Sequence, residues 1–206
     1  MKLVEKSISD FSGILASGAP TPGGGSAAAL TGALGASLIS MVASLTIGRK
    51  KYAEYEPLMK DIVRRADELR LKMLYIIDHD ADAYNTVTAS LAMPKDSAYE
   101  KAARSTAIQA ALKACTVTPF EILECSLRAL ELAQEMTGRF NTNAASDLGV
   151  AALNLKAAAQ GAWLNVLINL DGIRDDVFVS RYRQSGSELV RKAIALADGI
   201  GNALAD

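Results

Sequence analysis

The stretch PLMKDIVRRADELRLKMLYIIDHDADAYNTVTASLA, residues 57–92, decides the fold class. Its apolar side chains recur every three or four positions without a break, and Pro57 stands where the first turn of a helix tolerates a missing amide. A period near 3.6 residues over this length predicts one long amphipathic helix. Its apolar stripe comprises Ile62, Ala66, Leu69, Met73, Ile76, Ile77, Tyr84, Val87 and Leu91.

Helical patterns of the same kind cover almost all of the remaining sequence. We expect further helices at 4–17, 26–47, 97–114, 119–137, 144–170 and 175–204. Thr118 and Pro119 are interpreted as the cap and first residue of a new helix, and Gly138 as the end of that helix. No stretch alternates as a β-strand would. The sequence therefore predicts an all-α, single-domain bundle of about seven helices over residues 1–206, around the long apolar helix at 26–47.

Composition and charge limit the kinds of partner. The chain is 50% hydrophobic but only 5% aromatic, so small aliphatic side chains must fill the core. A net charge of -1 without a basic tract argues against a nucleic-acid partner. The uncharged segment 26–48 is long enough to cross a membrane, but its many Ala, Gly, Ser and Thr residues fit better a helix that other helices enclose. We therefore expect no membrane partner.

The cysteines and the N-terminus indicate the compartment. Cys115 and Cys125 have no CxxC spacing, and two thiols in a chain of this size do not suggest a disulfide framework. Charged residues interrupt the apolar residues of the N-terminus, unlike the core of a secretory signal. We expect reduced thiols and a cytoplasmic protein.

One carboxylate interrupts the apolar stripe of the helix at 57–92. Asp80 projects into the middle of the stripe, whereas its neighbours Asp78 and Asp82 point the opposite way as surface charges. A carboxylate in such a place needs a partner, a raised pKa or a cleft in which it transfers protons. We predict that Asp80 is a catalytic acid or base; the alternative is a structural Asp that caps another helix or pairs with an arginine. His79, the only histidine, does not by itself make a metal site, so no metal is expected.

The helix at 144–170 carries a second polar face. Its polar members are Asp147, Asn154, Asn165 and Asn169, and the small residues on the same side are Ala151, Ala158 and Gly161. Small residues leave room beside them, and amides in that room can offer donors and acceptors to a flat heterocycle. Helix packing with the amides bonded across the interface explains the pattern equally well.

The loop TPGGGS at 21–26 opens directly into a helix. Its free amides and the positive end of the helix dipole can hold an anion or a ligand carbonyl. The predicted contacts are Gly23, Gly24 and Gly25. No strand precedes the loop, which argues against a dinucleotide-binding fold. At the other end of this helix, the basic run 49–51 either offsets the dipole or meets an anionic substrate.

These motifs together resemble one family over nearly the whole chain. They are Thr21 to Gly25, Leu45 to Tyr52, Asp80 with Ala83 and Tyr84, Leu91 to Lys95, Asn141 and Asn143 with Ser146 and Asp147, and Asn165-Val166 with Asn169. In this order they resemble the formiminotransferase-cyclodeaminase C-terminal family, which includes stand-alone methenyltetrahydrofolate cyclohydrolases and the cyclodeaminase half of a bifunctional enzyme. The resemblance implies an all-α homodimer, no metal or nucleotide cofactor, and an acidic catalytic group near Asp80. The run Arg49-Lys50-Lys51 departs from relatives with three lysines, so which cation meets the substrate stays open.

From the resemblance we expect hydrolysis of 5,10-methenyltetrahydrofolate to 10-formyltetrahydrofolate, with Asp80 as general acid and base. The residues expected to orient the pterin and the water are Asn143, Asp147, Asn165 and Asn169, and those expected to meet the glutamate carboxylates are Lys50 or Lys51. The alternative within the family is the cyclodeamination of formimidoyltetrahydrofolate with release of ammonia, which we place second because no formiminotransferase domain is attached. The alternative of another class is a non-catalytic helical scaffold. The uncharged helix at 26–47 also favours a homodimer.

Overall fold

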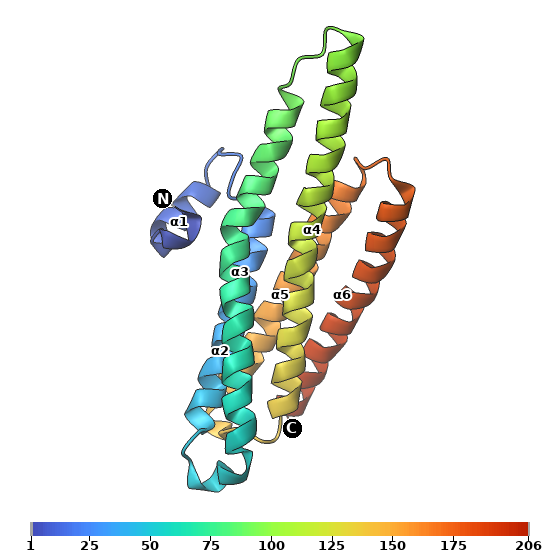
Figure 1. Ribbon diagram of the computed structural model, residues 1–206. Helices are drawn as coiled ribbons and strands as arrows, with labels where there is room; N and C mark the ends of the chain where they lie inside the picture. The colour runs from blue at the N-terminus through green and yellow to red at the C-terminus, as the bar shows by residue number, and fades with distance from the viewer. Residues whose placement is uncertain (1, 206) are drawn as a thin grey trace.

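The computed structural model describes residues 2–205, and every regular element in that range is a helix (Figure 1). The elements are η1 Leu3–Glu5, α1 Ile8–Leu15, α2 Gly24–Thr46, η2 Lys50–Tyr55, α3 Glu56–Leu91, α4 Ala98–Met136, η3 Thr142–Ala144, α5 Ala145–Leu170 and α6 Asp176–Ala205. The prediction of an all-α bundle around a long apolar helix is confirmed.

Local sequence signals explain where these helices begin and end. Ser97 and Glu100 form a capping box that starts α4, and Gly138 follows the end of that helix with a φ of 78°. The predicted helix at 4–17 is wrong in its extent, because the chain forms η1 and then α1. Ser7 caps α1, with its Oγ accepting a hydrogen bond from the backbone N–H of Asp10.

The predicted break at Pro119 is also wrong, because α4 runs through it without interruption. A proline at this position cannot donate to the carbonyl of Cys115 four residues earlier. That carbonyl instead accepts a 2.7 Å hydrogen bond from Nδ2 of Asn169 on α5. Since the freed acceptor is satisfied by another helix, and Pro119 is itself buried, the helix continues.

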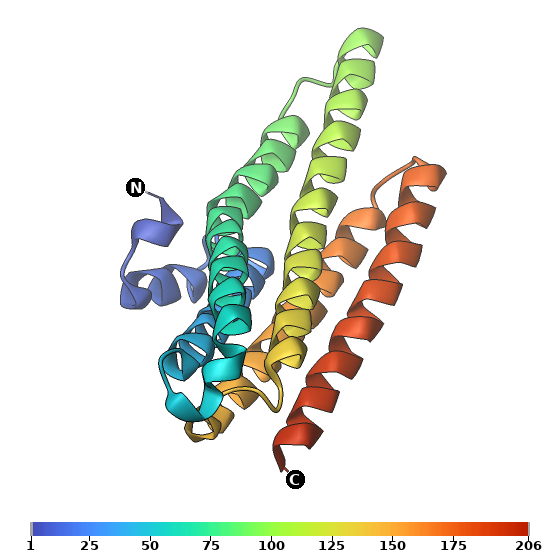
Figure 2. The ribbon, with the colours of Figure 1, turned by 60° about the horizontal axis from the view of Figure 1, so that its bottom comes forward.

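The helices α2 to α6 share one hydrophobic core, and α2 packs mainly against α3 and α5 (Figure 2). Close packing of α2 depends on its small residues: a Cβ on Gly35 would meet the side chain of Leu155, and one on Gly32 would meet Met73. By length and composition alone, α2 could also cross a membrane, with a mean hydropathy of 1.7 and half of that window buried in the protein. A core helix of this composition passes the same test.

The enclosure of α2 by other helices is incomplete. Large apolar side chains on α2 and on α5, two helices that pack against each other, are exposed to solvent, with exposed fractions between 39% and 72%. They are Leu34, Met41, Leu45, Val150, Leu153, Leu164 and Ile168. We call this surface the α2–α5 apolar face.

The α3–α4 hairpin projects beyond the adjoining ends of α5 and α6 (Figure 1). Its two arms are held together near the tip by Arg104, whose guanidinium donates two hydrogen bonds, of 3.0 and 3.2 Å, to the carbonyl of Leu91. Lower on the hairpin, Gln109 donates to the carbonyl of Gly172, which ties α4 to the loop between α5 and α6. The α3–α4 hairpin therefore lies beside the loop between α5 and α6 and extends past it.

Candidate functional site

The first turn of α2, the middle of α3 and the last turns of α5 meet around a cavity of about 210 Å³. The residues that line it are Pro20, Thr21, Gly23, Gly24, Gly25, Asp80, Tyr84, Cys115, Asn165, Ile168 and Asn169. Six of the predicted site residues are thus brought together: Gly23, Gly24, Gly25, Asp80, Asn165 and Asn169. We call this cavity the Asp80 cavity.

Asp80 reaches across from α3 to the N-terminus of α2. Its Oδ2 lies 3.0 Å from Oγ of the fully buried Ser26, which is also 3.0 Å from the carbonyl oxygen of Ile77. Burial raises the pKa of the Asp80 carboxyl above its ordinary value, and the hydrogen bonds from Ser26 oppose that rise only in part. Asp80 therefore caps another helix, as in the structural alternative, and also lines an open cavity, where a carboxyl with a raised pKa can exchange protons with a ligand.

Glycine at position 25 permits this close approach. A Cβ built on Gly25 would lie 2.6 Å from both Cγ and Oδ2 of Asp80, a separation that side chains do not tolerate. At the next position, a Cβ on Gly24 would lie 3.3 Å from Nδ2 of Asn165. The amides of this first turn have no intrahelical acceptors, so they remain available to a ligand or to the Asp80 carboxylate.

The amide nitrogens of Asn165 and Asn169 each donate to a backbone carbonyl. Nδ2 of Asn165 donates to the carbonyl of Gly161 over 2.9 Å, and Nδ2 of Asn169 donates to the carbonyl of Cys115 over 2.7 Å. A carbonyl can only accept, so both amides are fixed in orientation. Within residues 2–205 neither amide oxygen accepts a hydrogen bond, so both can serve as acceptors beside the Asp80 carboxylate, which suits a ligand rich in N–H donors or carrying positive charge.

The other predicted residues lie at the opposite end of α2. Asn141 donates from its backbone N–H to Oγ1 of Thr46 and from its side chain to the carbonyl of Leu45, which docks the turn before α5 onto that end. The helix rise puts this end roughly 30 Å from Ser26 and hence from the Asp80 cavity. The residues placed there are Lys50, Lys51, Asn143 and Asp147. Within one chain they do not join the Asp80 cavity.

Sequence reasoning missed several residues that shape the cavity. Ser26 holds Asp80, yet a serine after a glycine loop carries no signal of a contact with a helix more than fifty residues away. Cys115 lines the cavity, and burial followed by the charge of Asp80 raises the pKa of its thiol to about 11, so it stays protonated at neutral pH. Ile168 also lines the cavity, as does Tyr84, which the sequence had placed in the apolar stripe of α3 and in the motif around Asp80.

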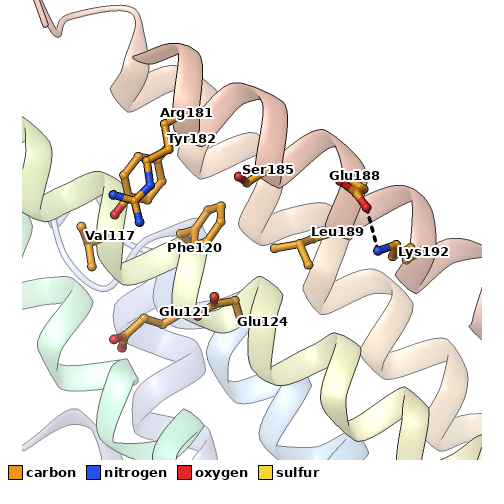
Figure 3. A pocket seen from close by; sticks show the side chains of 10 residues that line it. All are labelled: Val117, Phe120, Glu121, Glu124, Arg181, Tyr182, Ser185, Glu188, Leu189 and Lys192. Atoms are coloured by element: carbon orange, nitrogen blue, oxygen red, sulfur yellow. Dashed lines mark ion pairs between the residues drawn. The ribbon is translucent and has the colours of Figure 1, made fainter. Parts of the chain in front are cut away.

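A larger hollow lies between α4 and α6, as Figure 3 shows, with a volume of about 460 Å³. We call it the α4–α6 groove. Its walls carry Glu121, Glu124 and Glu188, and Lys192 lies 2.7 Å from Glu188. Within residues 2–205, no three His, Cys, Asp or Glu side chains gather closely enough to hold a metal ion. The expectation of a metal-free reaction remains a prediction.

Three kinds of known protein resemble this chain. Methenyltetrahydrofolate cyclohydrolase of Methylorubrum extorquens is 40% identical over 195 residues, which cover 95% of this chain and 94% of that protein. Formimidoyltransferase-cyclodeaminase of Sus scrofa is 33% identical over 191 residues, which cover 93% of this chain but 35% of that protein. The crystal structure of formiminotetrahydrofolate cyclodeaminase from Thermotoga maritima matches with a TM-score of 0.81 and 30% identity, over 97% of this chain and 94% of that one.

The family comparison covers most of the sequence. The family model described as formiminotransferase-cyclodeaminase matches residues 7–188, a range that contains every residue of the Asp80 cavity. The match also spans the opposite end of α2, with Lys50 and Asn143. By sequence, by length and by fold, the chain belongs to the formiminotransferase-cyclodeaminase family.

Proposed function

We propose that this protein is a methenyltetrahydrofolate cyclohydrolase, which converts 5,10-methenyltetrahydrofolate and water to 10-formyltetrahydrofolate. The observation that carries the proposal is the Asp80 carboxyl, which faces the cavity with a raised pKa beside two fixed amide oxygens. The 40% identity to a cyclohydrolase of similar length supports the same reaction.

The chemistry follows from the charge of the substrate. The methenyl carbon lies between N5 and N10 and carries delocalised positive charge, so the Asp80 carboxylate stabilises it electrostatically. Asp80 takes a proton from water as the oxygen bonds to that carbon. It then gives this proton to N5 as the bond between carbon and N5 breaks, and the remaining hydroxyl proton leaves to solvent. Such general acid and base assistance is worth ~10² to 10⁴-fold in rate.

The polar groups around Asp80 would fix the pterin. The amide oxygens of Asn165 and Asn169 accept hydrogen bonds, which matches the ring N–H and amino groups of a tetrahydropterin. The free amides of the first turn of α2, at Gly24 and Gly25, donate hydrogen bonds, which matches the pterin carbonyl oxygen. Placing both sets of groups on rigid helices limits the motion of the reacting carbon relative to Asp80.

We also propose that the α2–α5 apolar face is covered by a second copy of this chain. Exposing a large apolar surface to water costs free energy. Helix α2 contains no charged residue that would oppose self-association through this face. The face extends from Ile168 at the Asp80 cavity to Leu45 at the far end of α2, so a two-fold axis across its middle would set each Asp80 cavity beside the other copy's far end. Lys50, Lys51, Asn143 and Asp147 of the second copy would then border the mouth.

The cyclodeamination of formimidoyltetrahydrofolate is the second candidate. The 30% identity and TM-score of 0.81 to a formiminotetrahydrofolate cyclodeaminase favour it. In that reaction N10 attacks the formimino carbon and Asp80 protonates the departing ammonia. A helical scaffold without activity stays the alternative of another class. A cytoplasmic location, the lack of a cofactor and the lack of nucleic-acid or membrane partners also remain proposals.

The test is a pair of assays on the purified protein. We expect rapid loss of methenyltetrahydrofolate absorbance above the rate without protein, and no ammonia from formimidoyltetrahydrofolate. Turnover of the formimidoyl substrate alone would transfer the assignment to the cyclodeaminase. Turnover of neither substrate by a folded protein would refute both and leave the scaffold.

A further inference from the structure

Four cations surround a second cavity, of about 240 Å³, near the tip of the α3–α4 hairpin. Its lining consists of Lys95, Lys101, Arg104, Ser105, Ile108, Gln109 and Arg174. None of these residues is acidic, and within the described part of the chain none of the four cations forms an ion pair. We call this cavity the cationic cleft.

The two guanidinium groups of the cationic cleft are held by hydrogen bonds to neutral acceptors. Arg104 donates to the carbonyl of Leu91, and Nη1 of Arg174 donates to Oγ of Ser105 over 3.2 Å. The backbone N–H of Arg174 is itself held by the side-chain oxygen of Gln109. Like charges gathered in this way repel one another, so their placement is expected to serve a ligand that carries negative charge.

Two carboxylates on the neighbouring segments are engaged elsewhere. Glu100 accepts hydrogen bonds at the start of α4, where it completes the cap with Ser97. Asp175 lies 2.6 Å from Nζ of Lys113, which lowers the pKa of its carboxyl. Neither of these two carboxylates pairs with a cation of the cationic cleft, so Arg104 and Arg174 can meet an anionic ligand.

The cationic cleft and the Asp80 cavity lie along the same face of α4. Cys115, Ile108 and Lys101 are spaced by seven residues each, which places them on one side of the helix. From Cys115 to Ile108 the helix rises roughly 10 Å, and Lys101 is about as far again. Between the two cavities this side of α4 carries the half-buried apolar side chains of Ile108 and Leu112, and Leu112 lies close to Gly172.

The substrate of the proposed reaction has a matching shape and charge. Beyond the pterin, tetrahydrofolate carries a flat p-aminobenzoyl group and then a glutamate with two carboxylates, and this arm spans roughly 10 Å at ordinary bond lengths. A pterin in the Asp80 cavity could therefore lay its ring along the apolar surface and bring its carboxylates to Arg174 and Arg104. No cation lines the Asp80 cavity itself.

We propose that the cationic cleft binds the glutamyl carboxylates of the substrate, an inference that rests on the proposed function. It assigns this role to residues of the same chain rather than to Lys50 or Lys51. Carboxylates and guanidinium groups form short, charge-assisted hydrogen bonds, so Arg104 and Arg174 suit a carboxylate ligand. The contact holds the substrate before and during the reaction, so it acts on KM more than on kcat.

The experiment compares KM and kcat for methenyltetrahydrofolate among charge-reversal variants. We expect Arg174→Glu to raise KM by about tenfold or more with kcat within about twofold, the loss of one charge-assisted contact. Arg174→Lys should recover part of the loss. Lys192→Glu, which reverses a cation in the α4–α6 groove, is the matched control and should leave both constants unchanged.

The outcomes separate this inference from the proposed function. Unchanged KM in Arg174→Glu, or a rise only in Lys51→Glu, would overturn the cationic cleft while the enzyme still turned over. Failure of the wild-type protein to hydrolyse the substrate would refute the function instead. As a direct probe, p-aminobenzoylglutamate should inhibit the wild-type protein competitively and inhibit Arg174→Glu about tenfold more weakly.

Discussion

The Asp80 cavity and the α4–α6 groove both contain carboxylates, but their surroundings act on them in opposite directions. In the groove, the hydrogen bond from Lys192 lowers the pKa of the Glu188 carboxyl, so it stays an ordinary ion. In the Asp80 cavity, burial raises the pKa of Asp80. The groove is about twice as large, at about 460 Å³ against about 210 Å³. A functional site is therefore better recognised by the groups that converge on it than by its volume.

The largest expected difference comes from neutralising one carboxylate in each hollow. Asp80→Asn should lower kcat/KM by ~10² to 10⁴-fold, because the variant has no base for the attacking water. Glu188→Gln, the control, should change it by less than about twofold. The rate at which methenyltetrahydrofolate absorbance is lost gives kcat/KM for both variants. Similar rates for the two variants would mean that the Asp80 carboxylate does no chemistry.

The second test moves the Asp80 carboxylate without removing it. Gly25→Ala should lower kcat by roughly 10- to 100-fold, since the new Cβ collides with the carboxylate and displaces it from its working position. Gly199→Ala on α6 adds the same methyl group where nothing lies within 4 Å and should keep full activity. The melting temperature of each variant, followed by circular dichroism, distinguishes displacement from unfolding. A fully active Gly25→Ala would contradict the need for this close approach.

A third difference concerns what covers each hollow. Ile168 belongs both to the wall of the Asp80 cavity and to the α2–α5 apolar face, whereas the lining of the α4–α6 groove contains no member of that face. Leu164→Glu should weaken self-association by at least about tenfold, since a charge in a buried contact costs several kcal/mol, and activity should fall with it. Val177 is an apolar residue on α6 that is 80% exposed, and Val177→Glu should change neither self-association nor activity. Sedimentation equilibrium reports the mass; a wild-type monomer would exclude the dimer.

The smallest expected effect is on stability and its dependence on pH. Because the folded protein raises the pKa of Asp80 above the unfolded value of about 3.9, the folded state holds this proton more tightly. Stability contributed by protonated Asp80 is therefore lost as the pH rises through the folded pKa. Asp80→Asn should raise the melting temperature more at pH 7 than at pH 4, and wild-type activity should fall about tenfold per unit below that pKa. An equal shift at both pH values would contradict the burial of the charge.

Much of the fold could be predicted because helices are encoded locally. The period of α3, the capping box at Ser97 and the glycine at 138 each act within a few residues of the element that they specify. The exception at Pro119 arises because the acceptor that it frees is satisfied by Asn169, whose position depends on the packing of α5 on α4. A rule based on neighbouring residues cannot foresee such a partner.

The sequence by itself determined the helical class and the candidate carboxylate, since both follow from periodicity along one helix. Only the tertiary structure decided which predicted residues meet. Helix crossings bring Asp80 to Ser26 and Asn165, while the length of α2 keeps Lys50 and Asn143 roughly 30 Å away in the same chain. The cationic cleft likewise joins α4 to the loop after α5. Contacts between distant segments depend on how helices pack, and that information is spread over the whole core.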